Sequence, residues 1–165
     1  MTVLTQARLK KLLNYAPDTG AFRWKVSTSN RAPVGSVAGT KRPDGYIRIK
    51  LDRSCYLAHR LAWLYMTGKW PRAETDHINC VRDDNRYRNL REASRAENMR
   101  NEPTRANNTS GSKGVHLHAK TGKWQAQIMV DRVSVYLGLF DHIKDAAAAY
   151  AEASKRHHKD FGRLT

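Results

Sequence analysis

Four side chains between residues 74 and 101 have the chemical types that metal-assisted hydrolysis uses: Asp76, His77, Asn89 and Asn98. A neutral imidazole titrates near working pH, which suits His77 as a general base. Carboxylate and amide oxygens are hard ligands that suit Mg²⁺ or Mn²⁺, and Mg²⁺ typically takes only one or two protein ligands. Asp76 and Asn98 carry such oxygens and are the candidate ligands of one divalent ion, which would act as Lewis acid and template.

The elements that position these residues follow from the local pattern. Asp76 and His77 end a short segment and lead into a loop rich in Asp, Asn and Arg, and residues 90–93 can form a second short strand. Residues 94–97 form a capping box, so a helix is expected to begin there, with Asn98 in its first turns. The expected local order is strand, long loop, strand, helix.

Other roles are open for several side chains in and near this region. Asn89 can be a turn residue, and Asn85 fits a turn better than a site. If Asn98 is only an exposed helix residue, Asn101, one turn further on the same face, is the substitute ligand. His59 has apolar neighbours on an expected helix, which suits a buried, hydrogen-bonded role as well as contact with the site.

Three short motifs follow one another at the spacing of a known nuclease motif: Asp76-His77, Asn89-Leu90-Arg91 and Glu97-Asn98. On these motifs the chain resembles the HNH endonuclease family, in the branch found in phage and homing nucleases. The resemblance extends upstream to the His-Arg-Leu at residues 59–61 and to the Gly and Pro of residues 68–71. It covers roughly residues 46–101.

This resemblance implies a single-metal ββα core at about residues 73–101, in which Asn89 braces the loop so that His77 is oriented. It also implies cleavage of double-stranded DNA to 5′-phosphate and 3′-hydroxyl ends. Three arginines are the expected phosphate contacts in this half: Arg60, Arg91 and Arg95. One position departs from the family pattern, because Cys80 stands where members often have glycine, and a tight turn there is expected to change.

The charge of the chain also favours a nucleic-acid partner. It has 30 Lys and Arg against 15 Asp and Glu, a formal net charge of +15, and the basic surplus runs through all thirds of the sequence. Such a field attracts polyanions. Cys55 and Cys80 lack the spacing of zinc ligands, so no structural zinc is expected. The sequence has no run of about 18 apolar residues, so we expect no membrane association and a cytoplasmic location in a bacterial or phage-infected cell.

The N-terminal half shows helix and strand patterns ahead of the motif. Residues 5–13 have leucines at helical spacing behind Thr5 as N-cap, and residues 57–67 form an apolar helix that ends at Gly68. Residues 22–26 and 46–51 alternate as short strands.

The C-terminal part begins after a small, polar stretch. We place a domain boundary near residue 106 and a linker at residues 106–111. Period-two alternation at residues 115–118, 124–130 and 133–139 predicts a three-stranded antiparallel sheet with one buried face. Residues 143–157 form the helix expected to cover that face, with Asp141 as N-cap. His157 and His158 have the pattern of a solvated helix end.

The other face of this sheet is expected to be open and polar, with Arg132 at its edge. Its predicted members are His116, His118, Gln125, Gln127, Ser134 and Tyr136. A three-stranded sheet can read a groove of DNA from such a face.

This segment resembles the AP2 domain, a DNA-binding module of plant transcription factors that also accompanies phage HNH nucleases. The matching pieces are residues 112–115, 122–124, 136–140 and 146–150. The resemblance adds Lys113 and Tyr150 to the expected DNA contacts. Plant members have several arginines where His, Gln and Ser stand here, so DNA binding is implied but the recognised DNA sequence is not.

The sequence thus predicts an α+β protein. Residues 1–105 form an N-terminal region and a ββα-metal HNH nuclease domain, and residues 112–165 form an AP2-like sheet on one helix. The predicted function is a metal-dependent DNA endonuclease, with a monomer favoured. The alternative is a non-catalytic, sequence-specific DNA-binding regulator, but the complete Asp76, His77 and Asn98 set favours the enzyme. The length and the absence of any His-x-x-Arg exclude a tyrosine recombinase.

Overall fold

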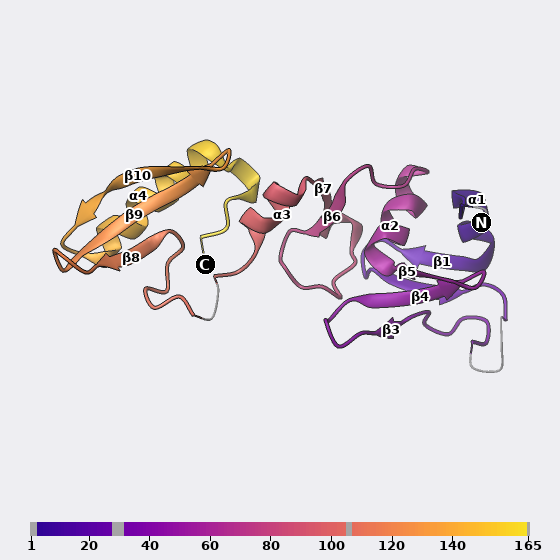
Figure 1. Cartoon of the computed structure of the whole chain (residues 1–165). Coiled ribbons are helices and arrows are strands. Elements are labelled where there is room, and N and C mark those ends of the chain that lie inside the picture. The colour runs from indigo at the N-terminus through magenta and orange to yellow at the C-terminus, as the bar shows by residue number, and fades with distance from the viewer. Residues whose placement is uncertain (1–2, 28–31, 105–106, 165) are drawn as a thin grey trace. The chain divides into compact units, whose positions relative to one another are not determined.

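The computed structural model describes residues 3–27, 32–104 and 107–164 of the chain. Within these ranges it has four α-helices and ten short strands in small antiparallel sheets, an α+β composition (Figure 1). The chain divides into two compact units, Met1–Arg95 and Ala96–Thr165. The predicted boundary near residue 106 falls on residues 105 and 106, outside the described residues, and the division between the units comes earlier. No helix in the described part of the chain is long and apolar enough to cross a membrane.

The first unit begins with a helix and a hairpin. Helix α1 (Gln6–Leu12) starts at Thr5, whose hydroxyl accepts the backbone N–H of Arg8 at 3.2 Å. This hydrogen bond satisfies one of the free N–H groups at the helix start, so the predicted cap is confirmed. Strands β1 (Leu13–Ala16) and β2 (Ala21–Trp24) pair as an antiparallel hairpin.

A second sheet and a helix follow. Strands β3 (Thr40–Lys41), β4 (Ile47–Leu51) and β5 (Ser54–Leu57) form an antiparallel sheet in the order β3-β4-β5. Helix α2 (Ala58–Thr67) comes next and ends at Gly68, whose φ of 77° is the left-handed conformation that glycine adopts readily. The predicted strand near residues 46–51 and the predicted helix with its glycine stop are confirmed.

One apolar core joins these elements. Its largest fully buried side chains come from α1, the hairpin, β4 and α2, and include Leu9, Leu13, Phe22, Ile49 and Leu61. Burial of each such side chain stabilises the fold by roughly 1.5–3 kcal/mol. The hairpin and α2 therefore belong to one packed core, which precedes the loop between β6 and β7 in the sequence.

The candidate motif begins on a two-stranded antiparallel sheet. Strand β6 (Glu74–His77) pairs with β7 (Leu90–Ala93), and the short 3-10 helix η1 (Tyr87–Asn89) leads into β7. The register places Asp76 opposite Arg91. The predicted strand at residues 90–93 is confirmed at both ends.

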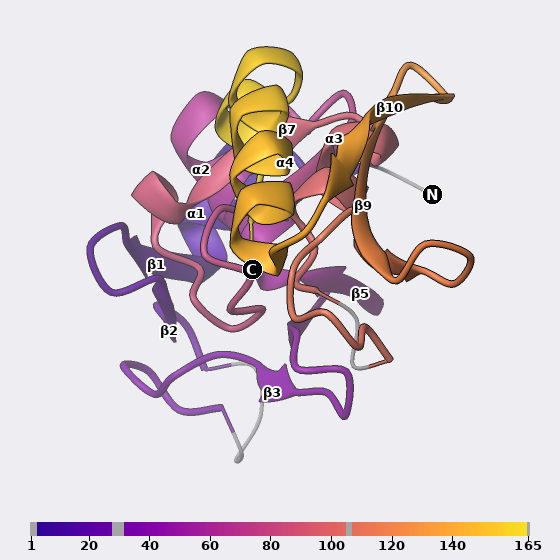
Figure 2. The ribbon, with the colours of Figure 1, turned by 90° about the vertical axis from the view of Figure 1, so that its left-hand side faces the viewer.

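Helix α3 (Arg95–Asn101) starts where the capping box predicted and leads into the second unit. That unit has a three-stranded antiparallel sheet in the order β10-β9-β8 and a long helix that lies along one of its faces (Figures 1 and 2). The elements are β8 (Val115–His118), β9 (Lys123–Val130), β10 (Val133–Phe140), α4 (Ile143–His157) and the 3-10 helix η2 (Lys159–Phe161).

The sheet and α4 are held by small and apolar side chains. Val115, Ala126 and Ala146 are buried between them, with larger side chains such as Trp124 and Phe140 packed around. The alanines let helix and sheet approach closely. The predicted strands and helix of this unit are confirmed to within one residue at each end.

Two local predictions about α4 are wrong. The N-cap is His142 and not Asp141, whose carboxylate instead pairs with the ammonium of Lys123 at 2.9 Å. His158 is not solvated, because its Nε2 donates to the carbonyl oxygen of Met129 at 2.9 Å and the residue is 7% exposed.

Residues of the predicted linker form an ordered turn in the second unit. The hydroxyl of Ser110 donates to the carbonyl oxygen of Val115 at 2.7 Å, and Asn108 Nδ2 donates to the carbonyl of Ser112 at 3.0 Å. Side-chain hydrogen bonds of this kind give a polar, Ser- and Asn-rich segment a fixed shape.

Candidate active site

His77 is the last residue of β6, and only 4% of it is exposed. Its Nε2 lies 3.3 Å from Oδ1 of Asn85, a residue of the loop between β6 and β7. Asn85 is equally buried, and its Nδ2 donates to the carbonyl oxygen of Asp83 at 3.1 Å. The sequence favoured a turn role for Asn85, but the structure places its amide against the imidazole of the predicted base.

Two more rings surround His77. The ring of His59, from α2, meets it edge to face at 4.9 Å between centroids, and the ring of Tyr46 lies 5.9 Å away. Of the two roles open for His59, the structure shows contact with the site, because its buried ring touches the ring of His77. Its Nδ1 is buried and has no hydrogen-bond partner among the described residues.

The pKa values of both imidazoles are lowered, which favours their neutral forms. Burial lowers the pKa of His77 below its ordinary value, while the hydrogen bond with Asn85 and the charge of Asp76 oppose that shift. Burial and the neighbouring charges of His77 and Arg60 lower the pKa of His59 to about 3. A neutral imidazole can accept a proton, which is what a general base must do.

Asp76 lies beside His77 on β6 and is 5% exposed. Arg91, its cross-strand partner, places Nε and Nη2 each 2.9 Å from the Asp76 Oδ2 atom. The guanidinium offsets the charge of this buried carboxylate and fixes its direction. Arg91, an expected phosphate contact, therefore orients Asp76 in this structure.

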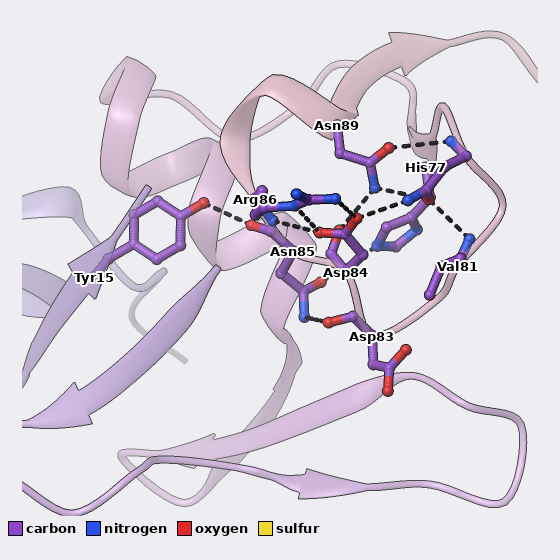
Figure 3. Close-up of polar contacts among 9 residues, drawn as sticks. Tyr15, His77, Val81, Asp83, Asp84, Asn85, Arg86 and Asn89 are labelled. Carbon is purple, nitrogen blue, oxygen red and sulfur yellow. Dashed lines mark hydrogen bonds and ion pairs between the residues drawn. The ribbon is translucent and has the colours of Figure 1, made fainter. Parts of the chain in front are cut away.

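Asn89 closes the loop between β6 and β7 (Figure 3). Its Oδ1 accepts the backbone N–H of Asn79 at 3.0 Å, and its Nδ2 donates to Asn79 Oδ1 at 2.9 Å and to the carbonyl oxygen of Asp84 at 2.8 Å. One buried amide thus ties together the two sides of the loop. Asn89 acts on the loop backbone, whereas Asn85 contacts the His77 ring.

The same loop contains an ion pair and a constrained turn. The Arg86 guanidinium lies 2.7 and 2.5 Å from the two carboxylate oxygens of Asp84 and holds the pKa of that carboxyl at about 2. Cys80 has a φ of 61°, a left-handed conformation that costs a non-glycine residue roughly 1 kcal/mol. The turn is therefore present where Cys80 replaces the glycine of the family pattern, at the cost of some strain.

Asn98 and its alternative Asn101 both lie on α3, which is described with the second unit. Asn101 is buried, at 4% exposure, whereas Asn98 is half-buried. The end of α3 is fixed within its own unit, because the ammonium of Lys113 donates to the carbonyl oxygens of Arg100, at 3.0 Å, and of Glu102. Lys113, an expected DNA contact, is thus engaged with the backbone.

Residues 56–100 match the family model of the HNH endonucleases. This HNH segment runs from β5 into α3 and includes all four candidate residues. The match supports an HNH nuclease, which is a DNA-cleaving hydrolase of a family that generally uses a divalent metal ion. No curated protein and no solved structure matches the chain.

The donors of the HNH segment fit a hard divalent ion with few protein ligands. In residues 3–27, 32–104 and 107–164, no three His, Cys, Asp or Glu side chains gather as a metal site. Mg²⁺ does not need such a cluster, because it keeps several water molecules and binds through one or two protein oxygens. The oriented carboxylate of Asp76 has the chemistry that this ion prefers.

The second unit presents the polar face that the alternation predicted. Cross-strand partners lie on the same side of a sheet, and the register pairs His116 with Gln125 and Tyr136 with Gln127. The hydroxyl of Ser134 is 3.4 Å from Gln127 Oε1, so this side chain lies on that face as well. The opposite side of β9 is buried at Ala126 against α4.

The remaining expected contacts differ in exposure. Arg132 lies in the exposed turn between β9 and β10, and Arg95 is exposed at the start of α3. Arg60 is half-buried on α2. Tyr150 packs in the core between α4 and the sheet, where burial raises the pKa of its hydroxyl, so it does not belong to the open face.

Sequence reasoning missed Asn85 and did not single out Tyr46. Asn85 stands in a run of Asp, Asn and Arg, the composition of an ordinary turn, and only its burial distinguishes it. Tyr46 alternates as a strand residue, and its contact with His77 depends on how the β3-β4-β5 sheet folds back.

Proposed function

We propose that this protein is a metal-dependent endonuclease of the phage or homing type, which hydrolyses phosphodiester bonds in double-stranded DNA. In this proposal the HNH segment cuts, and the second unit binds DNA as an AP2-like domain. The protein acts as a monomer, and its ion is Mg²⁺ or Mn²⁺. The observation that carries the proposal is a buried, neutral His77 beside an oriented Asp76, inside the segment that matches HNH endonucleases.

The chemistry follows from these side chains. A water molecule gives a proton to the His77 imidazole as its oxygen bonds to phosphorus. The bond from phosphorus to the 3′ oxygen breaks, and the leaving oxygen takes up a proton from solvent water. The products carry a 5′-phosphate and a 3′-hydroxyl. Asp76 and Asn98 would hold the divalent ion, which supplies Lewis acidity to the phosphate and the leaving oxygen when bound. Asn89 keeps the loop closed, so that His77 and Asp76 hold their directions.

Binding of DNA by the second unit rests on a different set of residues. The open face of its sheet carries hydrogen-bonding side chains, and Arg132 adds charge at the turn next to it. Donors and acceptors on such a face match those on base edges in a groove. The net charge of +15 favours association with any DNA before a site is recognised.

The test compares cleavage by the wild type and by His77→Ala. Double-stranded DNA from the source genome is incubated with each protein and Mg²⁺ or Mn²⁺, and the ends are mapped. General bases contribute about 10²- to 10⁴-fold to rate, so His77→Ala should lose at least about 100-fold. His157→Ala, at an exposed position on α4, is the matched control and should cut like the wild type.

The outcomes separate the candidate functions. Cleavage that stops with a chelator and with His77→Ala supports the nuclease. Equal cleavage by the wild type and His77→Ala rejects His77 as the base. If the wild type binds DNA but leaves it intact with both ions, the non-catalytic regulator replaces the enzyme.

A further inference from the structure

We propose that Arg82 binds a phosphate of the DNA that flanks the scissile bond, and that the turn between β3 and β4 holds its guanidinium in place for this contact. The inference deepens the proposed function, on which DNA as the substrate rests. It adds a substrate-binding residue on the loop between β6 and β7, which is not among the arginines expected from the sequence.

The carboxylates of this loop are paired with cations other than Arg82. A carboxylate oxygen of Asp83 lies 2.6 Å from the ammonium of Lys41. The carboxylate of Asp84 pairs with the guanidinium of Arg86. Arg82 is exposed, and no carboxylate among the residues that the structure describes pairs with it. The loop therefore presents one positive charge that these carboxylates do not offset.

The guanidinium of Arg82 has a fixed direction although it is exposed. Its Nη1 donates to the backbone carbonyl oxygen of Asp44 at 2.9 Å, and its Cζ lies 5.2 Å from the centroid of the Tyr46 ring. The carboxylate of Asp44 pairs with Arg42 at 2.9 Å, so Asp44 meets Arg82 through a neutral carbonyl. A carbonyl and an aromatic face direct a guanidinium without cancelling its charge.

Tyr46 connects this cation to the candidate base. Its ring lies 5.9 Å from the ring of His77 and 5.3 Å from that of His59, between centroids. Both imidazoles are buried, whereas Tyr46 is half-buried and Arg82 is exposed. The guanidinium therefore lies on the solvent side of this group of rings, where a DNA strand that approaches His77 would meet it.

The chemistry of a guanidinium in this position suits a phosphate. Arginine is always charged, and its planar fork of N–H groups can pair with two phosphate oxygens. A phosphate contact fixes the register of the strand without reading its bases. Of the arginines expected to make such contacts in this unit, Arg91 pairs with Asp76 and Arg60 is half-buried. Arg82 is therefore better placed than either to anchor the strand.

The first experiment measures binding to duplexes that each carry one uncharged methylphosphonate in place of a phosphate. The duplexes span the site that the protein cuts or, if it does not cut, the site that it protects, and a chelator prevents cleavage. Arg82→Gln should bind the unmodified duplex about 10-fold more weakly, because a hydrogen bond to a charged group is lost. On the duplex that is uncharged at the anchored phosphate, wild type and variant should bind equally. An equal penalty on every duplex, or no penalty, would overturn the inference.

Two further variants complete the comparison. Arg82→Lys keeps the charge but loses the planar fork, and should recover part of the affinity. Arg88→Gln is the matched control, because it removes another exposed arginine of the HNH segment, on η1, and should bind within about twofold of the wild type. The same loss in Arg88→Gln and Arg82→Gln would show that only the overall charge matters, and would overturn the inference.

Cleavage kinetics test the position of the bound phosphate. Arg82→Gln should raise KM about 10-fold and change kcat less than about threefold, because a contact away from the reacting atoms stabilises substrate and transition state alike. A kcat about 100-fold lower at unchanged KM would place Arg82 at the scissile phosphate and overturn the flanking contact. A wild type whose penalty is confined to one phosphate but which cuts no DNA would support the Arg82 inference and reject the nuclease.

Discussion

At the scale of single residues, the site depends on two imidazoles that are buried rather than solvated. His59 and His77 are 5% and 4% exposed, and their rings touch. A charged imidazole in such surroundings would lose its hydration and repel its neighbour, so both rings stay neutral where free histidine begins to take up protons. This arrangement keeps the base available but makes the fold sensitive to acid.

His59 should make the first unit less stable as the pH falls. Its folded pKa of about 3 lies below the ordinary 6.5, so between these values the unfolded chain binds more protons and the free energy of unfolding drops as pH drops. The slope approaches about 1.4 kcal/mol per pH unit, which gives a loss of about 2 kcal/mol between pH 7 and pH 5. Urea unfolding at the two pH values measures this loss.

His59→Phe keeps a ring of similar size and removes the titration. Its free energy of unfolding should fall about 2 kcal/mol less than that of the wild type over the same range. His157→Phe, at an exposed position, serves as the control and should follow the wild type. Equal pH dependence in His59→Phe and the wild type would show that folding does not shift the pKa of His59.

At the scale of elements, the second unit depends on a close approach between the residues before β8 and helix α4. Gly114 stands just before β8 with a φ of +65°, and its carbonyl oxygen accepts the Gln127 N–H at 2.8 Å. A Cβ at this position would lie 2.3 Å from both the Gln127 carbonyl oxygen and the ring of Tyr150. The ring of Tyr150 thus occupies the space that a side chain at position 114 would need.

Gly114→Ala should destabilise the second unit by roughly 2–5 kcal/mol, since it combines a left-handed backbone with an overlap in the core. Gly122→Ala is the matched control, because Gly122 has a similar φ of +68° but nothing within 4 Å of its Cβ position. The control should cost only about 1–2 kcal/mol. Native-state hydrogen exchange of the β9 backbone amides measures both losses, and equal losses would mean that the overlap relaxes freely.

At the scale of the whole molecule, the net charge should determine how strongly the affinity for DNA depends on salt. The formal net charge of +15 is spread along the chain and not collected in a tail. Binding driven by phosphate contacts releases counterions, so affinity falls with salt in proportion to the number of contacts. Polar contacts to bases change affinity without that salt dependence.

Arg132→Gln tests the exposed turn beside the open face as a phosphate contact. The slope of log affinity against log salt should become shallower by about one unit, because one fewer phosphate is neutralised. Lys155→Gln removes the same charge from the exposed surface of α4 and should leave the slope near that of the wild type. Fluorescence anisotropy on labelled duplex DNA over a salt series gives both slopes. The same reduction in both variants would indicate a diffuse field with no defined face.

Most of the secondary structure could be predicted from the sequence, because it is encoded by neighbours. Period-two alternation identified β8 and the other strands of its sheet, the capping box located the start of α3, and Gly68 marked the end of α2. The candidate residues Asp76 and His77 were also recognisable, since their types and spacing carry the motif within one short segment.

Only the tertiary structure decided which polar side chains are buried and what they contact. Asn85, Lys113 and His158 all have sequence surroundings typical of solvated residues, yet they bond to a ring, to the end of a helix and to a neighbouring strand. The physical reason is that a polar group loses water only where segments distant in sequence supply its hydrogen-bond partners, and a local pattern contains no record of those segments.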